Sequence, residues 1–170
     1  AKHCVEPDKI GTVYRVYIPK NHSEKFDYVN ERFMLVSKSS VSDLALLQSL
    51  KSGDMGTPKI DIYRGYPKFG SLVYNVSYAM TLPPQITSGY LGLLEYAPFG
   101  DVSISSIFRR ASVMTAPGSS GSALVMYDRG DYNIIGILTG GVRGGSAIWY
   151  TSFWTPTYEI VDFIDSLKGT

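Results

Sequence analysis

Most of this sequence consists of short segments rich in β-branched and aromatic residues, each followed by turn-forming residues. Residues 12–18 (TVYRVYI) alternate between two faces, and residues 71–78 (SLVYNVSY) and 132–138 (YNIIGIL) have the same character. Clusters of Gly, Pro and Asp separate such segments, for example at residues 98–101 (PFGD). Alternation with a period of two predicts half-buried strands, and turn residues at this spacing predict an antiparallel barrel or sandwich.

The end of the chain has a different pattern. Thr155 can cap a helix that has Pro156 in its first turn. Apolar residues then follow at helical spacing, at Ile160, Val161, Phe163, Ile164 and Leu167. The sequence therefore predicts an all-β protein with one C-terminal α-helix. Residues 80–89 (MTLPPQITSG) are the predicted hinge between its two halves.

Composition excludes several classes of function. The 170 residues carry 16 Lys and Arg against 15 Asp and Glu, a net charge of +1, so no strong field attracts nucleic acid or a membrane surface. The sequence has no run of 18 apolar residues that would predict a membrane span, and we see no signal-peptide pattern at its start. The single Cys favours a non-secreted, bacterial or viral setting, such as a host cytoplasm or a virion. Two distant His and one Cys make no metal-ligand cluster, and no nucleotide-binding loop is present, so we expect no cofactor.

A candidate nucleophile is Ser120, within residues 115–122 (TAPGSSGS). A serine hydroxyl is inert without a base that takes its proton. The flanking glycines allow a tight turn in which backbone N–H groups point at one spot, where an oxyanion could be stabilised. The same residues could equally form a simple Gly- and Ser-rich β-turn, so this motif alone does not decide.

A base and an orienting acid complete the set. The sequence has two histidines, of which His22 lies in a polar stretch typical of an exposed loop, and His3 lies in Ala-Lys-His-Cys. Asp43 directly precedes an apolar segment, where a carboxylate can be buried and aimed at a base. An Asp at the start of a strand more commonly caps backbone donors.

Taken together, these motifs resemble those of chymotrypsin-like serine proteases. Ala-Lys-His-Cys is similar to their Ala-Ala-His-Cys, Ser-Asp-Leu-Ala-Leu-Leu to their Asp-Ile/Leu-Ala-Leu-Leu, and Pro-Gly-Ser-Ser-Gly-Ser-Ala-Leu to their Gly-Asp/Asn-Ser-Gly-Gly-Pro-Leu. The order His3, Asp43, Ser120 is also that of the family. Residues 72–89 resemble the opening of the second barrel in compact HtrA-type members. The Thr-x-x-Gly-x-Ser-Gly pattern that ends at Gly121 resembles proteases of positive-strand RNA virus polyproteins.

The resemblance implies a fold and a division of the chain. The expected fold is all-β, with two six-stranded antiparallel β-barrels and a C-terminal α-helix. Residues 1–80 would form the first barrel with His3 and Asp43, and residues 81–170 the second barrel with Ser120. Only two residues precede His3, where the family has about two strands, so we expect an N-terminally truncated first barrel. An upstream segment or the chain's own precursor would then be a partner, besides a polypeptide substrate.

The resemblance also implies a mechanism, that of a serine endopeptidase which works through an acyl-enzyme. Ser120 would be the nucleophile, His3 the general base and Asp43 its orienting acid. The backbone N–H groups of Gly118 and Ser120 would form the oxyanion hole. A viral polyprotein is the substrate that the virus-type pattern implies.

The expected substrate-binding residues follow from the same resemblance. Thr139 would lie behind the triad, Met114 would line the base of the specificity pocket, and Gly141 and Ile148 would form its walls. Trypsin-like enzymes have an Asp where Met114 stands, so we expect a preference for apolar or small side chains. Packing in the core is the alternative interpretation of these residues.

Two other functions remain to be weighed against the enzyme. A protease fold could be catalytically silent, or could cleave itself once and then serve a structural or binding role, which Ser122 and Ala123 after the nucleophile would suit. A nucleic-acid-binding barrel is supported only by the aromatic content, and packing explains that content equally well.

Overall fold

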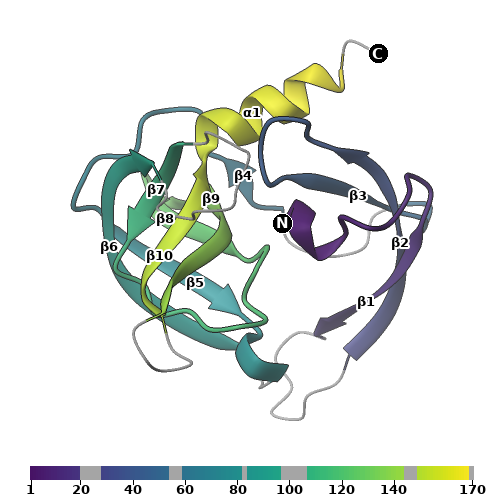
Figure 1. Ribbon diagram of the computed structural model, residues 1–170, viewed down its shortest axis with the longest axis horizontal. Coiled ribbons are helices and arrows are strands. Elements are labelled where there is room, and N and C mark those ends of the chain that lie inside the picture. The colour runs from purple at the N-terminus through teal and green to yellow at the C-terminus, as the bar shows by residue number, and fades with distance from the viewer. Residues whose placement is uncertain (20–27, 54–58, 82–83, 97–106, 144–148, 169–170) are drawn as a thin grey trace.

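The computed structural model describes residues 1–19, 28–53, 59–81, 84–96, 107–143 and 149–168. The described chain forms two β-sheets, with one α-helix at its C-terminal end (Figure 1). The expected all-β, chymotrypsin-like architecture with a terminal helix is confirmed. No helix in the described ranges has the length and apolarity to span a membrane.

The first sheet has three antiparallel strands in the order β1-β2-β3. Its strands are β1 (Val13–Pro19), β2 (Tyr28–Lys38) and β3 (Ala45–Ser49). A register shift between Leu35 and Ser37 bends β2 where it pairs with β3, and Leu35 is fully buried at that bend. This bend lies just before the turn that leads to Asp43, so the sheet positions one of the candidate site residues.

The second sheet has seven strands in the order β10-β7-β6-β5-β8-β9-β4, and β10 also pairs with β9. That extra pairing closes six of the strands into a ring, which is the second barrel (Figure 1). The strands are β4 (Asp61–Ile62), β5 (Leu72–Ser77), β6 (Gln85–Tyr96), β7 (Ile107–Ala111), β8 (Ala123–Asp128), β9 (Asp131–Arg143) and β10 (Trp149–Pro156).

The inside of this ring is the main hydrophobic core. Its members are Val73, Leu91, Ala111, Val113, Leu124, Met126, Ile135, Leu138 and Trp154. The buried Trp154 indole N–H donates to the Ser152 hydroxyl at 2.8 Å, so its polar atom is satisfied inside the ring. Gly136 allows this packing, because a Cβ there would lie only 3.0 Å from the Cβ of Trp154.

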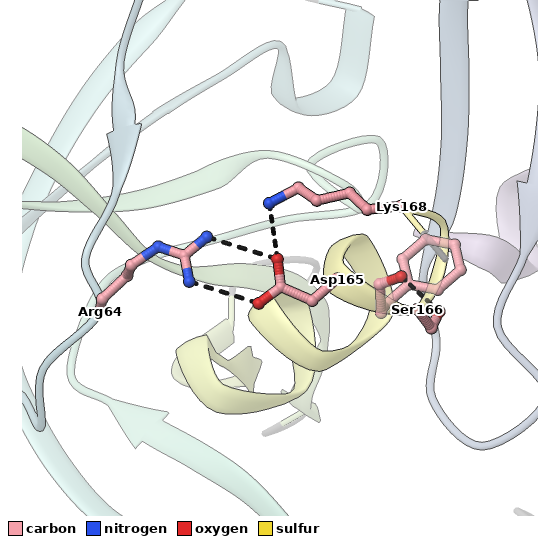
Figure 2. A network of polar contacts seen from close by, with 5 residues as sticks. Arg64, Asp165, Ser166 and Lys168 are labelled. Carbon is pink, nitrogen blue, oxygen red and sulfur yellow. Dashed lines mark hydrogen bonds and ion pairs between the residues drawn. The ribbon is translucent and has the colours of Figure 1, made fainter. Parts of the chain in front are cut away.

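The C-terminal helix α1 (Thr157–Ser166) has Pro156 as its N-cap, so it starts one residue later than a cap at Thr155 would place it. Thr155 and Pro156 continue β10, because they pair with Ile137 and Gly136 of β9. Ile160 is buried near the start of the helix, and Asp165 forms ion pairs near its end. Figure 2 shows the Asp165 carboxylate between Arg64, which follows β4, and Lys168. It accepts a hydrogen bond from Arg64 at 3.3 Å and one from Lys168 at 2.7 Å. Ion pairs as exposed as these contribute little to stability, so they orient the helix end rather than hold the fold.

Two positional predictions need correction. The second sheet begins before residue 81, because β4 and β5 both pair within it, so the sheets divide between Ser49 and Asp61 rather than at residue 80. The predicted hinge at residues 80–89 is also wrong in its second half, where Gln85 begins the 12-residue strand β6. The apolar alternation from Ile86 onward outweighs the preceding Pro-Pro, and the short helix η2 (Ala79–Thr81) occupies the start of the predicted hinge.

Candidate active site

His3 and Asp43 are in contact at the point where the chain enters β3 of the first sheet. His3 lies in a single turn of 3-10 helix, η1 (Lys2–Cys4), and Asp43 lies just before β3. The ring Nδ1 of His3 is 2.7 Å from Oδ2 of Asp43, and the backbone N–H of His3 donates to Oδ1 at 2.8 Å. The Asp43 side chain is 10% exposed and that of His3 43% exposed. A buried carboxylate thus holds both the ring and the backbone of a more open imidazole.

The turn before Asp43 is held by its own hydroxyl groups. The Ser39 hydroxyl accepts the N–H groups of Val41 and Ser42 at 3.2 and 3.1 Å, and the Ser42 hydroxyl donates to it at 2.9 Å. Lys2 ties this turn to η1, since its backbone N–H donates to the Asp43 carbonyl at 3.0 Å and its amine to the Ser39 carbonyl at 3.1 Å. These two hydrogen bonds from Lys2 therefore join η1 to the turn, next to the His3–Asp43 pair.

Ser120 lies in the loop between β7 and β8, and two glycines give that loop its shape. Gly118 and Gly121 have φ values of +92° and +86°, in the left-handed region that favours glycine. Tight turns follow, with the Ser119 N–H donating to the Ala116 carbonyl and the Ser122 N–H to the Ser119 carbonyl, both at 3.0 Å. Within the described ranges, no protein group accepts the N–H of Gly118 or Ser120. Two backbone donors on either side of Ser119 are thus available to a ligand.

The underside of this loop is fastened to β5 by residues that the sequence analysis missed. The Asn75 side-chain amide donates to the Ser122 hydroxyl and the Ala123 carbonyl, both at 2.8 Å. The Ser119 hydroxyl donates to the Ser77 hydroxyl at 3.3 Å. The signal for Asn75 was a polar residue at an inward position of an alternating strand, where a polar side chain requires partners.

The loop also contacts η1, which brings Ser120 beside the His3 element. The Cys4 sulfur lies 4.0 Å from the Ser120 carbonyl oxygen. A Cβ on Gly121 would lie 2.6 Å from the backbone nitrogen of Ala1, so these backbones touch. The three predicted catalytic residues are therefore contributed by three adjoining segments: His3 and Asp43 are directly bonded, and the Ser120 loop packs against η1.

The electrostatics of the pair depend on its hydrogen bonds. The hydrogen bond to Asp43, with a smaller contribution from Cys4, raises the pKa of His3 to about 10, although partial burial opposes this. The hydrogen bond with His3 lowers the pKa of the Cys4 thiol. Asp43 therefore stabilises the protonated form of the ring, which is the form that a base has once it has accepted a proton.

Strand β9 offers an unpaired edge next to the loop. Its pairing with β8 runs from Asp131 to Ile137, whereas its pairing with β10 continues to Arg143. Among the described residues of β9, the loop hydrogen-bonds only to Leu138, through Gly121 and Ser122 at 2.9 Å each. In the described part of the chain, residues 139–141 thus pair on one side only, and their other edge can accept an extended peptide.

The predicted substrate-binding residues have mixed positions. Met114 has a side chain 46% exposed, and its carbonyl accepts the Thr87 hydroxyl at 3.0 Å. The Thr139 hydroxyl shares a 3.0 Å hydrogen bond with the buried Thr155 of β10. Gly141 pairs with Ser152 on β10. Ile148 lies outside the described residues, and the roles of all four stay predictions.

In the described ranges, no three His, Cys, Asp or Glu side chains gather as metal ligands would. His22, which we expected in an exposed loop, lies outside the described residues.

Comparison with known proteins finds structural similarity alone. No protein-family model matches the sequence, and no curated protein does. Among solved structures, the HtrA-type protease AlgW with a decapeptide matches with a TM-score of 0.70 at 20% identity, over 91% of this chain and 44% of that one. AlgW with a tripeptide gives 0.69 at 20% identity, over 90% and 47%. The Rv3671c protease from M. tuberculosis H37Rv, in a Ser-to-Ala mutant described as an inactive form, gives 0.65 at 16% identity, over 84% and 67%.

These matches place the fold. The chain has the chymotrypsin-like fold of the HtrA-type proteases, as the sequence motifs predicted. It spans less than half of the AlgW chains that it matches.

Proposed function

We propose that this chain is a serine endopeptidase, with Ser120 as nucleophile, His3 as general base and Asp43 as orienting acid. The observation that carries the proposal is the pair of bonds from His3 to Asp43, at 2.7 Å through the ring and 2.8 Å through the backbone. A buried carboxylate bonded to Nδ1 leaves Nε2 as the nitrogen that can receive a proton from a serine. The Ser120 loop adjoins this element through Cys4 and Ala1.

In the proposed reaction, Ser120 Oγ attacks the carbonyl carbon of a peptide bond while His3 accepts the hydroxyl proton. The tetrahedral intermediate collapses when His3 returns that proton to the leaving amine, and an ester to Ser120 remains. Water then attacks the ester with His3 again as base, which releases the acid product and restores the serine.

The oxyanion hole of the proposal consists of the N–H groups of Gly118 and Ser120. The positive φ of Gly118 turns the loop there, and in the described part of the chain both N–H groups lack a protein acceptor. Removing one such donor in a studied protease costs about 2.7–4 kcal/mol of transition-state stabilisation. A preorganised pair of backbone donors would therefore supply a large part of the rate enhancement.

The proposed substrate is a polypeptide that pairs with residues 139–141 of β9. The one-sided pairing of those residues supports this, because backbone hydrogen bonds to a strand edge bind any extended sequence. Met114, Thr139, Gly141 and Ile148 are the residues proposed to select the side chain before the cleaved bond. The Thr-x-x-Gly-x-Ser-Gly pattern supports a viral polyprotein as the natural substrate.

The test is covalent labelling with a fluorophosphonate probe, read as the intact mass of the protein. One adduct on the parent chain and none on Ser120→Ala would support the proposal. Well-folded parent protein that takes no adduct, alone and with a longer N-terminal segment, would contradict it. That result would favour the alternative of a catalytically silent fold, or of an enzyme that cleaves itself once.

A further inference from the structure

The outer surface of the second barrel carries apolar side chains where a solvated strand carries polar ones. On β5 the alternation turns Val73 and Asn75 into the barrel and leaves their neighbours Leu72 and Val76 outside, 47% and 48% exposed. The β6 residues opposite them in the register, Tyr90 and Ile86, are 62% and 74% exposed. A sheet face that meets only water is expected to be polar at such positions.

Strands β8 and β9 continue this surface. Tyr127 and its cross-strand partner Tyr132 are 57% and 55% exposed, and their rings lie 5.1 Å apart. The Tyr132 ring also meets the edge of Tyr74 on β5, at 6.3 Å between centroids. These residues therefore join into one surface four strands wide, which we call the tyrosine face. It consists of Leu72, Tyr74, Val76, Ile86, Tyr90, Tyr127 and Tyr132.

The tyrosine face is large and uncharged. None of its seven members carries a charge, and their exposed fractions correspond to an apolar area on the order of 500 Å². The largest apolar patch on a typical monomer is about 300–600 Å² and is often functional. The face is therefore large enough to form most of one side of a standard interface, which buries about 800 Å² per partner.

The two sides of the face differ in shape. On the β8 side, a cavity of about 420 Å³ opens between β5, β8 and the segment after β4, and Tyr63, Leu72 and Tyr127 contribute to its lining. On the β6 side, Tyr90 lies opposite Leu72, at the level of the cavity, and is 62% exposed. A hollow and a protruding side chain thus lie on opposite sides of β5.

We propose that the tyrosine face is a homodimer interface, covered by a second copy of this chain about a twofold axis that runs along β5. Rotation about that axis keeps each residue at its level along β5 and sets the β6 side of one copy against the β8 side of the other. Tyr90, which is level with Leu72, therefore faces the cavity of the partner copy. A closed twofold contact requires a surface that complements itself, and an uncharged face can meet its copy without burying like charges.

Charges at the rim fit the same arrangement. Lys68 and Asp128 both line the cavity, so its rim carries one charge of each sign. A strongly basic or acidic partner would find no matching field on this surface, whereas a second copy presents the same neutral balance. This favours self-association over a charged partner.

Sedimentation velocity from about 1 to about 500 µM tests the proposal. We expect the parent chain to form a dimer as concentration rises. Tyr90→Asp and Tyr127→Lys should each remain monomeric, because each places an unpaired charge in both halves of the dimer interface. Tyr17→Asp, at a 62% exposed position on the first sheet, is the matched control and should dimerise like the parent.

Mixing the two monomeric variants tests the axis. In a mixed dimer, the new carboxylate of Tyr90→Asp faces the new amine of Tyr127→Lys, because both positions are level with Leu72, and the other half of the interface keeps its native residues. We therefore expect the mixture to dimerise although neither variant does so alone. A mixture that stays monomeric, a parent monomeric throughout, or variants that dimerise like the parent would each overturn the proposal. Thermal unfolding checks each fold, and Ile86→Asp, at another exposed position of the face, replaces a variant that does not fold.

Discussion

The Asn75 side chain on β5 donates one hydrogen bond to the Ser122 hydroxyl and a second to the carbonyl of the next residue, both at 2.8 Å. Asn75 is fully buried, and Ser122 lies two residues after the proposed nucleophile. The wall of the second barrel therefore fixes the end of the loop that carries Ser120. It also explains how the chain accommodates a serine where related proteases have a glycine: the extra hydroxyl has a partner.

Asn75→Ala should destabilise the fold by about 1–3 kcal/mol, because it leaves a buried hydroxyl and a carbonyl without their donor. Ser122→Ala should cost less, because Asn75 still donates to the Ala123 carbonyl. Urea unfolding of both variants and of the double variant gives their coupling energy, expected at about 0.5–3 kcal/mol. Purely additive effects would show that the two side chains do not act together.

The same variants separate positioning of the loop from stability. If Asn75 positions Ser120, the rate of fluorophosphonate labelling should fall at a temperature where the variant is still fully folded. Asn75→Asp keeps the size of the side chain but removes its donors, so it should label as slowly as Asn75→Ala.

Gly121 and Gly130 form a matched pair for testing the contact between the Ser120 loop and η1. Both have a positive φ, at +86° and +99°, so alanine strains the backbone of each by about 1 kcal/mol. Only at Gly121 would the new Cβ meet another segment, at 2.6 Å from the backbone nitrogen of Ala1, whereas Gly130 has open space around it. We therefore expect Gly121→Ala to lose more stability than Gly130→Ala and to label with the probe far more slowly. Equal losses and unchanged labelling would mean that the contact is not needed.

The raised pKa of His3 predicts an alkaline pH profile. His3 accepts a proton from the serine only when its ring is neutral, and the hydrogen bond that the ring donates to Asp43 raises its pKa to about 10 from the ordinary 6.5. Initial labelling rates should therefore keep rising with pH well above 6.5. In Asp43→Asn the rise should move to lower pH, because the main cause of the shift is gone, while the rate falls by about 10⁴-fold. An inflection that stays in place in this variant would contradict the assignment of Asp43.

The sequence contained enough to predict the fold class and the pair His3–Asp43. The alternation of a strand can be read from neighbouring residues. The short motifs around His3 and Asp43 can likewise be recognised without knowing how the chain folds. The contacts that hold the Ser120 loop could not be predicted from the sequence. Asn75 and Ser122 are 47 residues apart and meet only because β5 pairs with β8. The start of the helix was misplaced because pairing of Thr155 and Pro156 with β9 outweighs their local preference for a helix start. The tyrosine face was missed for a similar reason: an apolar strand residue does not reveal which side of a closed barrel it will occupy.

Glu159 on α1 gives a prediction about stability. It lines the cleft of about 330 Å³ between α1 and the turn that precedes Asp43, together with Lys38 and Asp162. Burial, with a smaller contribution from Asp162, raises its pKa to about 7 from 4.5, although a hydrogen bond with Tyr158 opposes this. Between these values the folded protein binds more protons than the unfolded chain, so stability falls as pH rises through about 4.5 to 7. Because Glu159 remains partly solvated, we expect this loss to be on the order of 1 kcal/mol.

Glu159→Gln removes the titrating group and should therefore be more stable than the parent at pH 8, and nearly equal to it at pH 4. The measurement is urea unfolding of both proteins across this range. Glu6→Gln, at an exposed position far from α1 in sequence, is the control and should follow the parent at every pH. If Glu159→Gln gained no stability at pH 8, the carboxylate would be better solvated in the folded protein than its burial in the cleft implies. Protonation of Glu159 would then not stabilise the packing of α1 against the turn before Asp43.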